Sequence, residues 1–374
     1  MNGALEFIAL ANIALLASFV AAWLIERLIR HTRFRHAYRL RLNLAIAALI
    51  AASLPIVLAP VTHALSSQLQ LNATDLLVSH YLKGNIGVTA LQLTDALDAK
   101  DRFLENLVGA TSTLSFGLLI AFGLAALIRT AYILFNLLRV RRLIAGGRVI
   151  RRTRRVDIIT SDRITIPFST RGLLRYAIVL PESLLKDRRS TAIVLGHEAQ
   201  HIRQHDVDWE IVLSLVSPLF ILNPAFLFLC DRIRRFREYS CDAALIENNR
   251  VDAKEYCLLL LRVASNATKA AKGRRGHTLS TSVPFFGRET FARRAGNTAL
   301  RQRVMAMTTT TPALRGPLRF LNAVPAIALA ALMTVAVLVL SKPADWSHDR
   351  IMLSTVANLE RLDRINGFGV RPLR

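Results

Sequence analysis

Four long stretches of the chain carry no charged residue and are apolar almost throughout: residues 7–25, 42–62, 107–128 and 320–341. Each has about 19 residues or more, and an α-helix of that length crosses the roughly 30 Å hydrocarbon core of a bilayer. The sequence therefore predicts four membrane-spanning helices. Because no Lys or Arg precedes Glu6 and basic residues follow the first stretch, we expect it to remain as an anchor and not to be removed as a signal peptide.

Between residues 129 and 319 the pattern changes to that of a folded domain. Short runs of β-branched and aliphatic residues predict strands at 156–160, 163–167 and 176–180, and Pro181 ends the last of them. Helical periodicity follows, and it predicts helices at 191–209, 231–248 and 299–307. The segment of about 190 residues is long enough to enclose a hydrophobic core of its own.

The composition supports a membrane protein. Of the 374 residues 52% are hydrophobic and only 20% are charged, which is too apolar for an ordinary soluble enzyme. The formal net charge is +23, and the arginines cluster directly beside the apolar stretches. We interpret them as topology signals that face the cytoplasm, so direct nucleic-acid binding is disfavoured. Three cysteines without a CxxC pair fit a reducing compartment better than a disulfide framework.

Loop charges orient the four predicted spans. The loop at 26–41 is strongly basic, whereas the loop at 63–106 has three basic residues against five acidic ones. The positive-inside rule places the first loop in the cytosol and the second outside. We therefore expect a three-helix membrane region at 1–138, a cytosolic domain at 139–319, a fourth span at 320–341 and a short external tail at 342–374. Both termini are external in this prediction.

The strongest chemical motif is His197-Glu198-Ala199-Gln200-His201, which has the pattern HExxH. Two histidines four residues apart project from one face of a helix, where both imidazoles can reach one Zn²⁺ ion. The glutamate is adjacent to the metal without binding it, so it can take a proton from the attacking water. A solvated helix that carries two histidines is the alternative interpretation. The motif predicts a hydrolytic zinc site with Glu198 as the catalytic base.

A catalytic zinc ion needs a third protein ligand and an open position. His205 continues the four-residue spacing, but residues at i, i+4 and i+8 of a straight helix extend over about 12 Å, too far for one ion. Glu238 is the better candidate, and Asp242 shares its helix face, so one can bind the metal while the other orients a ligand histidine. The alternative is that both are solvated acidic residues among neighbouring arginines.

The choice of Glu238 constrains the uncharged run at 211–230, which is long enough to be a further span. If this run crossed the membrane, Glu238 and His197 would lie on opposite sides. Pro218 and Pro224 instead favour a broken hairpin, either dipping into the bilayer or packed within the domain.

The chain resembles a known family at this point, the BlaR/MecR-type antirepressor metallopeptidases of bacterial membranes. The resemblance rests on the HExxH region, on the segment around the candidate third ligand and on the predicted strands. The positions that carry it are Gly196 to His201, Ile202, Asp206, Asn223-Pro224, Glu238, Cys241-Asp242, Ile166 to Phe168, Gly172 to Arg175 and Ile178 to Pro181. It extends from the first predicted span to the fourth.

The resemblance implies an α-helical membrane protein with a cytosolic α+β, zincin-like domain and one Zn²⁺ per chain. In this gluzincin-like arrangement His197, His201 and Glu238 bind the metal, and Asp242 and Asp206 support the ligands. The β-lactam sensors of the family carry an external penicillin-binding domain after the fourth span. Here only residues 342–374 follow that span, which is too short for such a domain.

The expected function is that of a zinc metalloendopeptidase of the bacterial cytoplasmic membrane, acting in signal transduction. Its substrate would be a cytosolic regulator, such as a transcriptional repressor, or the chain itself. Two alternatives stay open: a membrane quality-control peptidase of HtpX type, and a non-catalytic signalling scaffold in which the metal only stabilises the domain. The expected partners are a protein or peptide substrate and the lipid bilayer, and a homodimer stays open as well.

Overall fold

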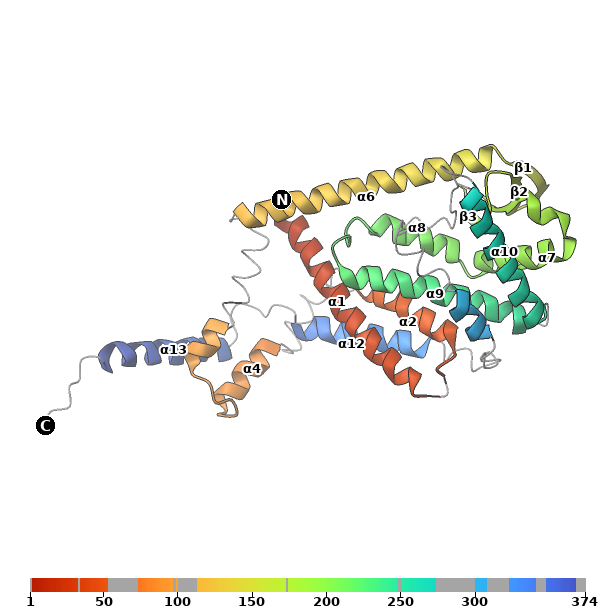
Figure 1. Cartoon of the computed structure of the whole chain (residues 1–374). Coiled ribbons are helices and arrows are strands. Elements are labelled where there is room, and N and C mark those ends of the chain that lie inside the picture. The colour runs from red at the N-terminus through yellow and green to blue at the C-terminus, as the bar shows by residue number, and fades with distance from the viewer. Residues whose placement is uncertain are drawn as a thin grey trace. The chain divides into compact units, whose positions relative to one another are not determined.

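The computed structural model describes most of the chain (Figure 1). The described residues are 2–32, 34–52, 73–96, 99, 113–172, 174–247, 251–273, 300–307, 323–340 and 348–367. They form two compact units. The first comprises residues 1–21, 47–122 and 327–374, and the second comprises residues 22–46 and 123–326.

Two described helices are long and apolar enough to cross a membrane. They lie within α1 (Asn2–Arg30) and α6 (Thr113–Ala145), as the segments Ala11–Arg30 and Leu119–Ala145. The first coincides with the first predicted span. The second is shifted towards the C-terminus relative to residues 107–128, because α6 continues without a break past Arg129.

The other two predicted spans coincide with shorter helices, which are not candidate spans by themselves. The second span falls on α2 (Tyr38–Ala51), and its remainder lies outside the described residues. The fourth falls on α12 (Val324–Leu340), in which Val324–Met333 is a short apolar helix. The described residues therefore contain two full-length candidate spans, not the four that the sequence predicts.

Within the first unit, segments that we predict to be external pack against each other. Helix α4 (Ala73–Leu82) and the helical residues 90–96 share a small hydrophobic cluster with α13 (His348–Gly367). The carboxylate of Glu360 accepts hydrogen bonds from the backbone N–H groups of Ala90 and Leu91, at 3.1 and 3.2 Å. The loop at 63–106 and the tail at 342–374 thus contact each other, as two segments on the same side of a membrane can.

The second unit contains a four-stranded mixed sheet. Its strands are β1 (Arg148–Arg152), β2 (Val156–Ser161), β3 (Phe168–Arg171) and β4 (Tyr176–Pro181), in the spatial order β1-β2-β4-β3. Strands β2 and β4 pair in parallel, with Ile158 opposite Ile178, whereas β1 and β3 are antiparallel edge strands. The predicted strands at 156–160 and 176–180 correspond to β2 and β4.

The prediction of a strand at 163–167 is wrong, because those residues form a turn and bends and β3 begins only at Phe168. Pro167 has no N–H group to donate to a neighbouring strand, which explains why regular pairing starts directly after it. Strand β1 was not predicted. Its sequence, RVIRR, does not alternate between hydrophobic and polar residues as that of a half-buried strand does, and all five residues are exposed.

Helices that follow the sheet in the chain form most of the remainder of the second unit, which also includes parts of α1, α2 and α6. They are α7 (Arg188–Arg203), α8 (Asp206–Val216), α9 (Pro224–Glu247), α10 (Ala253–Gly273) and a short helix at residues 300–307. The predicted helix at 191–209 is therefore two helices. His205 adopts a left-handed backbone conformation, with φ of 59°, which ends α7 and redirects the chain into α8.

The apolar run at 211–230 does not form one continuous helix. It contains the end of α8, a series of turns at 217–222 and the start of α9, whose first residue is Pro224. Proline is favoured in the first turn of a helix because its fixed φ suits that position and its missing N–H would have no partner there. The resulting helical hairpin agrees with the predicted break.

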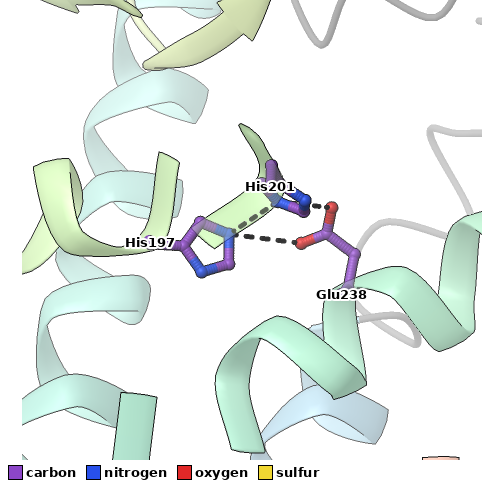
Figure 2. Close-up of side chains that lie close together, drawn as sticks. All are labelled: His197, His201 and Glu238. Carbon is purple, nitrogen blue, oxygen red and sulfur yellow. Dashed lines mark hydrogen bonds and ion pairs between the residues drawn. The ribbon is translucent and has the colours of Figure 1, made fainter. Parts of the chain in front are cut away.

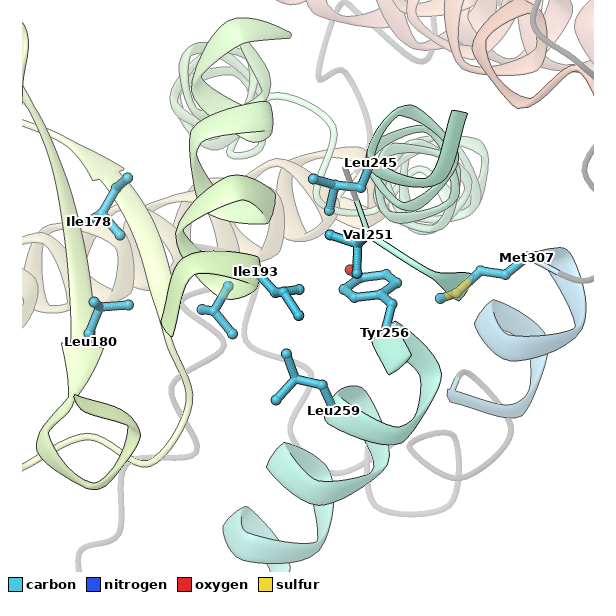
Figure 3. Close-up of a cluster of buried hydrophobic side chains, with 9 residues drawn as sticks. Ile178, Leu180, Ile193, Leu245, Val251, Tyr256, Leu259 and Met307 are labelled. Atoms are coloured by element: carbon cyan, nitrogen blue, oxygen red, sulfur yellow. The ribbon is translucent and has the colours of Figure 1, made fainter. Parts of the chain in front are cut away.

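One hydrophobic core joins β4, α7, α9, α10 and the short helix at 300–307 (Figure 3). Leu180 of β4, Ile193 of α7 and Leu245 of α9 are buried in one cluster, which also includes Met307 of the short helix. Tyr256 of α10 is only 1% exposed and also belongs to it. Burial of this core fixes α7 and α9 relative to each other, and these two helices carry the candidate metal ligands.

The first turn of α2 packs on α9 within the second unit. The rings of Tyr38 and Tyr239 meet edge to face, with 5.0 Å between their centroids. The guanidinium group of Arg41 lies over the ring of Phe236, 4.5 Å from its centroid. Phe236 and Tyr239 are close neighbours of Glu238 along α9, so the first turn of α2 contacts the helix that carries this residue.

Candidate metal centre

Helix α7 displays the HExxH residues because both its start and its packing are well defined. Asp187 caps the helix and accepts hydrogen bonds from the backbone N–H groups of Arg189 and Ser190, at 3.0 and 3.3 Å. Gly196 allows close packing on α9, since a Cβ atom at this position would lie 3.3 Å from Leu245 Cδ2. The following residue, His197, therefore faces α9 at short range.

His197, His201 and Glu238 converge at one point (Figure 2). The Nε2 atoms of the two histidines are 3.1 Å apart. The two oxygens of Glu238 lie 3.7 Å from the histidine nitrogens, Oε2 from Nε2 of His197 and Oε1 from Nε2 of His201. The HExxH helix and the candidate third ligand on α9 are thus brought together.

The three groups fit a zinc ion. Tetrahedral coordination with Zn–N and Zn–O bonds of about 2.0–2.1 Å separates neighbouring ligand atoms by about 3.4 Å. The 3.1 Å between the two histidine nitrogens and the 3.7 Å between Nε2 of His201 and Oε1 of Glu238 lie within a few tenths of an ångström of that value. Two imidazoles and one carboxylate are also the ligand set that leaves a fourth position open in catalytic zinc sites.

On the side away from this point, His201 is fixed by two buried groups. Its Nδ1 atom lies 2.9 Å from Oδ2 of Asp206 and 3.2 Å from the sulfur of Cys241. His201, Asp206 and Cys241 form a second group of possible metal ligands. Burial raises the pKa of the Cys241 thiol to about 12, which disfavours the thiolate that a metal would need. We therefore favour the first group as the metal site and assign Asp206 to the orientation of His201.

His197 is fixed by Tyr256 of α10. The Tyr256 hydroxyl lies 2.9 Å from Nδ1 of His197 and donates a hydrogen bond to Oδ1 of Asp242 at 2.7 Å. Asp242 itself is 3.5 Å from the same nitrogen, so the hydroxyl provides the shorter connection between them. Burial, together with the nearby Asp242 carboxylate, raises the pKa of Tyr256 well above its usual value, and the hydroxyl therefore stays protonated and able to donate.

Arg303, from the helix at 300–307, completes the polar network. Its Nε and Nη2 atoms donate to the two carboxylate oxygens of Asp242, at 2.9 and 2.7 Å, and its Nη1 atom lies 2.8 Å from Oε2 of Glu238. Burial opposes ionisation of Glu238, but the charge of Arg303 and the hydrogen bond with His197 hold the pKa of this carboxyl well below its usual range. Glu238 is therefore ionised, as a metal ligand must be.

Glu198 is buried on α7 beside His197, with 6% of its surface exposed, and it is not one of the three converging groups. His205 lies outside the site, because the chain leaves the helix there and Nδ1 of His205 lies 3.0 Å from Oδ2 of Asp208 instead. Two residues of the network, Tyr256 and Arg303, are not predicted from the sequence. Neither belongs to a motif, since each reaches the site only through tertiary packing.

Comparison with known proteins agrees with the geometry. A family model described as BlaR1 peptidase M56 matches residues 6–283, which is well over half of the 374 residues. The chain belongs to this family of membrane metallopeptidases. No curated protein matches the chain. The matched region includes both helices that carry the candidate ligands, but it ends before Arg303.

Proposed function

We propose that this chain is a membrane-embedded zinc metalloendopeptidase that cleaves a protein on the cytosolic side. The observation that carries the proposal is the convergence of His197, His201 and Glu238, with neighbouring ligand atoms 3.1 to 3.7 Å apart. Family membership supports the peptidase activity. The basic loop at 26–41 supports the cytosolic placement of the domain, with both termini outside.

His197, His201 and Glu238 would hold the zinc ion, which when bound polarises the scissile carbonyl and lowers the pKa of a water molecule towards 7. Glu198 takes the proton from the attacking water and passes it to the nitrogen of the leaving amine. Asp206 and the Tyr256–Asp242 pair hold the two imidazole rings in orientation, so the ligand atoms are in place before the metal binds.

The substrate in this proposal is a cytosolic regulator of the repressor type or the chain itself, so that cleavage transmits a signal. A quality-control peptidase of HtpX type would use the same site on many membrane proteins. A zinc-stabilised scaffold would need the two histidines but not Glu198. The number of cleaved proteins distinguishes the regulatory peptidase from the quality-control peptidase. The requirement for Glu198 distinguishes both peptidases from the scaffold.

The test compares cells that produce the wild-type chain with cells that produce Glu198→Gln, His201→Ala or the control Glu182→Ala, an exposed glutamate outside the site. Zinc content of the purified full chain and cleaved peptides in the proteome are measured together. We expect Glu198→Gln to retain zinc and to lose cleavage, His201→Ala to lose both, and the control to keep both. Undiminished cleavage in Glu198→Gln would overturn the proposal.

A further inference from the structure

Arg303 enters the metal centre from a part of the chain beyond the family match, which ends at residue 283. Its side chain is 18% exposed, and its three donor nitrogens are directed at two carboxylates of α9. The neighbouring Arg301 on the same short helix is exposed. The partial burial of Arg303 and the exposure of Arg301 indicate that the helix at 300–307 presents Arg303 specifically to the site.

The orientation of the Arg303 guanidinium group is fixed before any metal binds. Nε and Nη2 form a two-pronged interaction with Asp242, whose side chain is 2% exposed. Asp242 is in turn held by the Tyr256 hydroxyl at 2.7 Å. Because the guanidinium group is planar, anchoring one edge on Asp242 also fixes the direction of the remaining Nη1 donor. That donor is directed at Oε2 of Glu238, at 2.8 Å.

Oε2 of Glu238 is therefore paired with the guanidinium group of Arg303, whereas Oε1 of Glu238 is not paired with it. An unrestrained carboxylate can bind a metal through both oxygens, which uses an additional coordination position. A catalytic zinc site needs that position for water and for the substrate carbonyl. A charge-assisted hydrogen bond to one oxygen competes with the metal for that oxygen and leaves the other as the ligand.

We infer that Arg303 is a positioning residue that holds one oxygen of Glu238, so that the carboxylate binds zinc through its other oxygen alone and a coordination position stays open. This inference rests on the proposed metallopeptidase function. It assigns a role in the metal centre to a segment outside the region that the family match covers. It also makes the hydrogen-bonded path from His197 through Tyr256, Asp242 and Arg303 to Glu238 a single structural unit that connects two of the three ligands.

The experiment uses the full-length chain with the Glu198→Gln substitution throughout, so that self-cleavage cannot interfere. Zinc affinity is measured by competition with a chelator, and the coordination number is followed through the visible absorption of the Co²⁺-substituted protein. The variants are Arg303→Met, which removes the charge, and Arg303→Lys, which keeps a charge but cannot contact both carboxylates as a planar group. The matched control is Arg301→Met.

We expect Arg303→Met to lower zinc affinity by about 10- to 100-fold and to weaken the Co²⁺ absorption, as an increase in coordination number does. Arg303→Lys keeps a charge beside the two carboxylates but cannot contact both of them as a planar group, so it should also weaken the Co²⁺ absorption. The control should behave as the parent chain does. Unchanged zinc affinity and Co²⁺ spectra in both Arg303 variants would overturn the inference while leaving the proposed function intact. A parent chain that binds no zinc would overturn the proposed function instead.

Discussion

The hydroxyl oxygen of Tyr256 lies 2.9 Å from Nδ1 of His197, although the two residues are 59 positions apart in the chain. Nε2 of His197 is directed at the metal position, so Nδ1 carries the ring proton and donates a hydrogen bond to the Tyr256 hydroxyl oxygen. The hydroxyl in turn donates a hydrogen bond to Asp242. A neutral tyrosine thus relays the orienting effect of a carboxylate. In metal sites such a carboxylate more often bonds directly to the ring.

Replacing Tyr256 by Phe should weaken metal binding without unfolding the domain. The aromatic ring, which is part of the hydrophobic core, is retained, and only the hydroxyl that orients His197 is lost. Loss of such an orienting group lowers metal affinity by about 10- to 100-fold. Chelator competition and thermal unfolding of the same sample separate the two effects. A lower melting temperature with normal zinc affinity would contradict this role for the hydroxyl.

Replacing Glu26 by Gln should destabilise the second unit strongly. The Glu26 carboxylate is 5% exposed and pairs with Arg41 and Arg232, whose side chains are 13% and 17% exposed. Replacing the charged carboxylate by a neutral amide removes a buried anion from beside two largely buried cations, which costs about 3 kcal/mol or more of unfolding free energy.

Arg30 provides the control for this prediction. It also pairs with Glu26, at 2.9 Å, but its side chain is 55% exposed. An exposed ion pair contributes only about 0–1 kcal/mol, so Arg30→Ala should have a small effect. Unfolding of the detergent-solubilised chain would distinguish the two variants, and equal effects would show that burial does not govern this cluster.

Gly147→Ala should destabilise the connection between α6 and β1. A Cβ atom at this position would lie 2.4 Å from Cγ2 of Ile159 and 3.0 Å from the backbone oxygen of Thr160, so the strand itself would have to move. Overpacking of this kind costs about 1–3 kcal/mol. Gly146→Ala is the matched control, because its nearest neighbour, the oxygen of Arg142, would be 3.4 Å away. A melting temperature lowered equally by both substitutions would exclude the steric explanation.

Asp187, the cap of α7, should make stability depend on pH in the acid range. The hydrogen bond from the Ser190 hydroxyl at 2.6 Å, with those from the backbone N–H groups, holds the pKa of Asp187 below its usual value. A folded-state pKa below the unfolded one stabilises the protein above about pH 4, and this contribution disappears as the pH falls through the folded-state pKa.

Asp187→Ala should therefore lower the melting temperature by a few degrees at pH 7, and the loss should become smaller as the pH falls through the folded-state pKa of Asp187. Asp187→Asn retains a side-chain oxygen that can cap the helix, so it should be milder at pH 7 and should remove the pH dependence. Differential scanning fluorimetry at several pH values measures all three proteins. A loss in Asp187→Ala that does not change with pH would show that the ionised form of the cap has no special role.

The residues that sequence alone predicted are those whose role depends on local spacing. The HExxH helix brings His197 and His201 to one face whatever the rest of the fold does, and Glu238 was chosen because a third ligand had to follow on a second helix. Strands β2 and β4 were predicted because both are short runs rich in β-branched and aliphatic residues, and the structure buries half or more of each run. In each case the pattern reflects the structure of the segment itself.

The remainder depends on contacts between distant segments or on a single backbone angle. Tyr256 is one aromatic residue in an amphipathic helix, and nothing near it in the sequence indicates that its hydroxyl meets His197. Arg303 is one of many arginines, and only its burial against α9 distinguishes it from Arg301. The break between α7 and α8 at His205 was missed because a left-handed conformation in a non-glycine residue leaves no compositional signal.

The packing of Tyr38 and Arg41 on α9 has a practical consequence for anyone who would study the peptidase in isolation. The second compact unit includes residues 22–46 as well as 123–326. A soluble fragment taken from residues 123–326 alone would therefore lack part of this unit. Such a fragment would expose the rings of Phe236 and Tyr239 beside Glu238. A truncated chain that preserves the second unit has to include residues 22–46, which form the hairpin between α1 and α2.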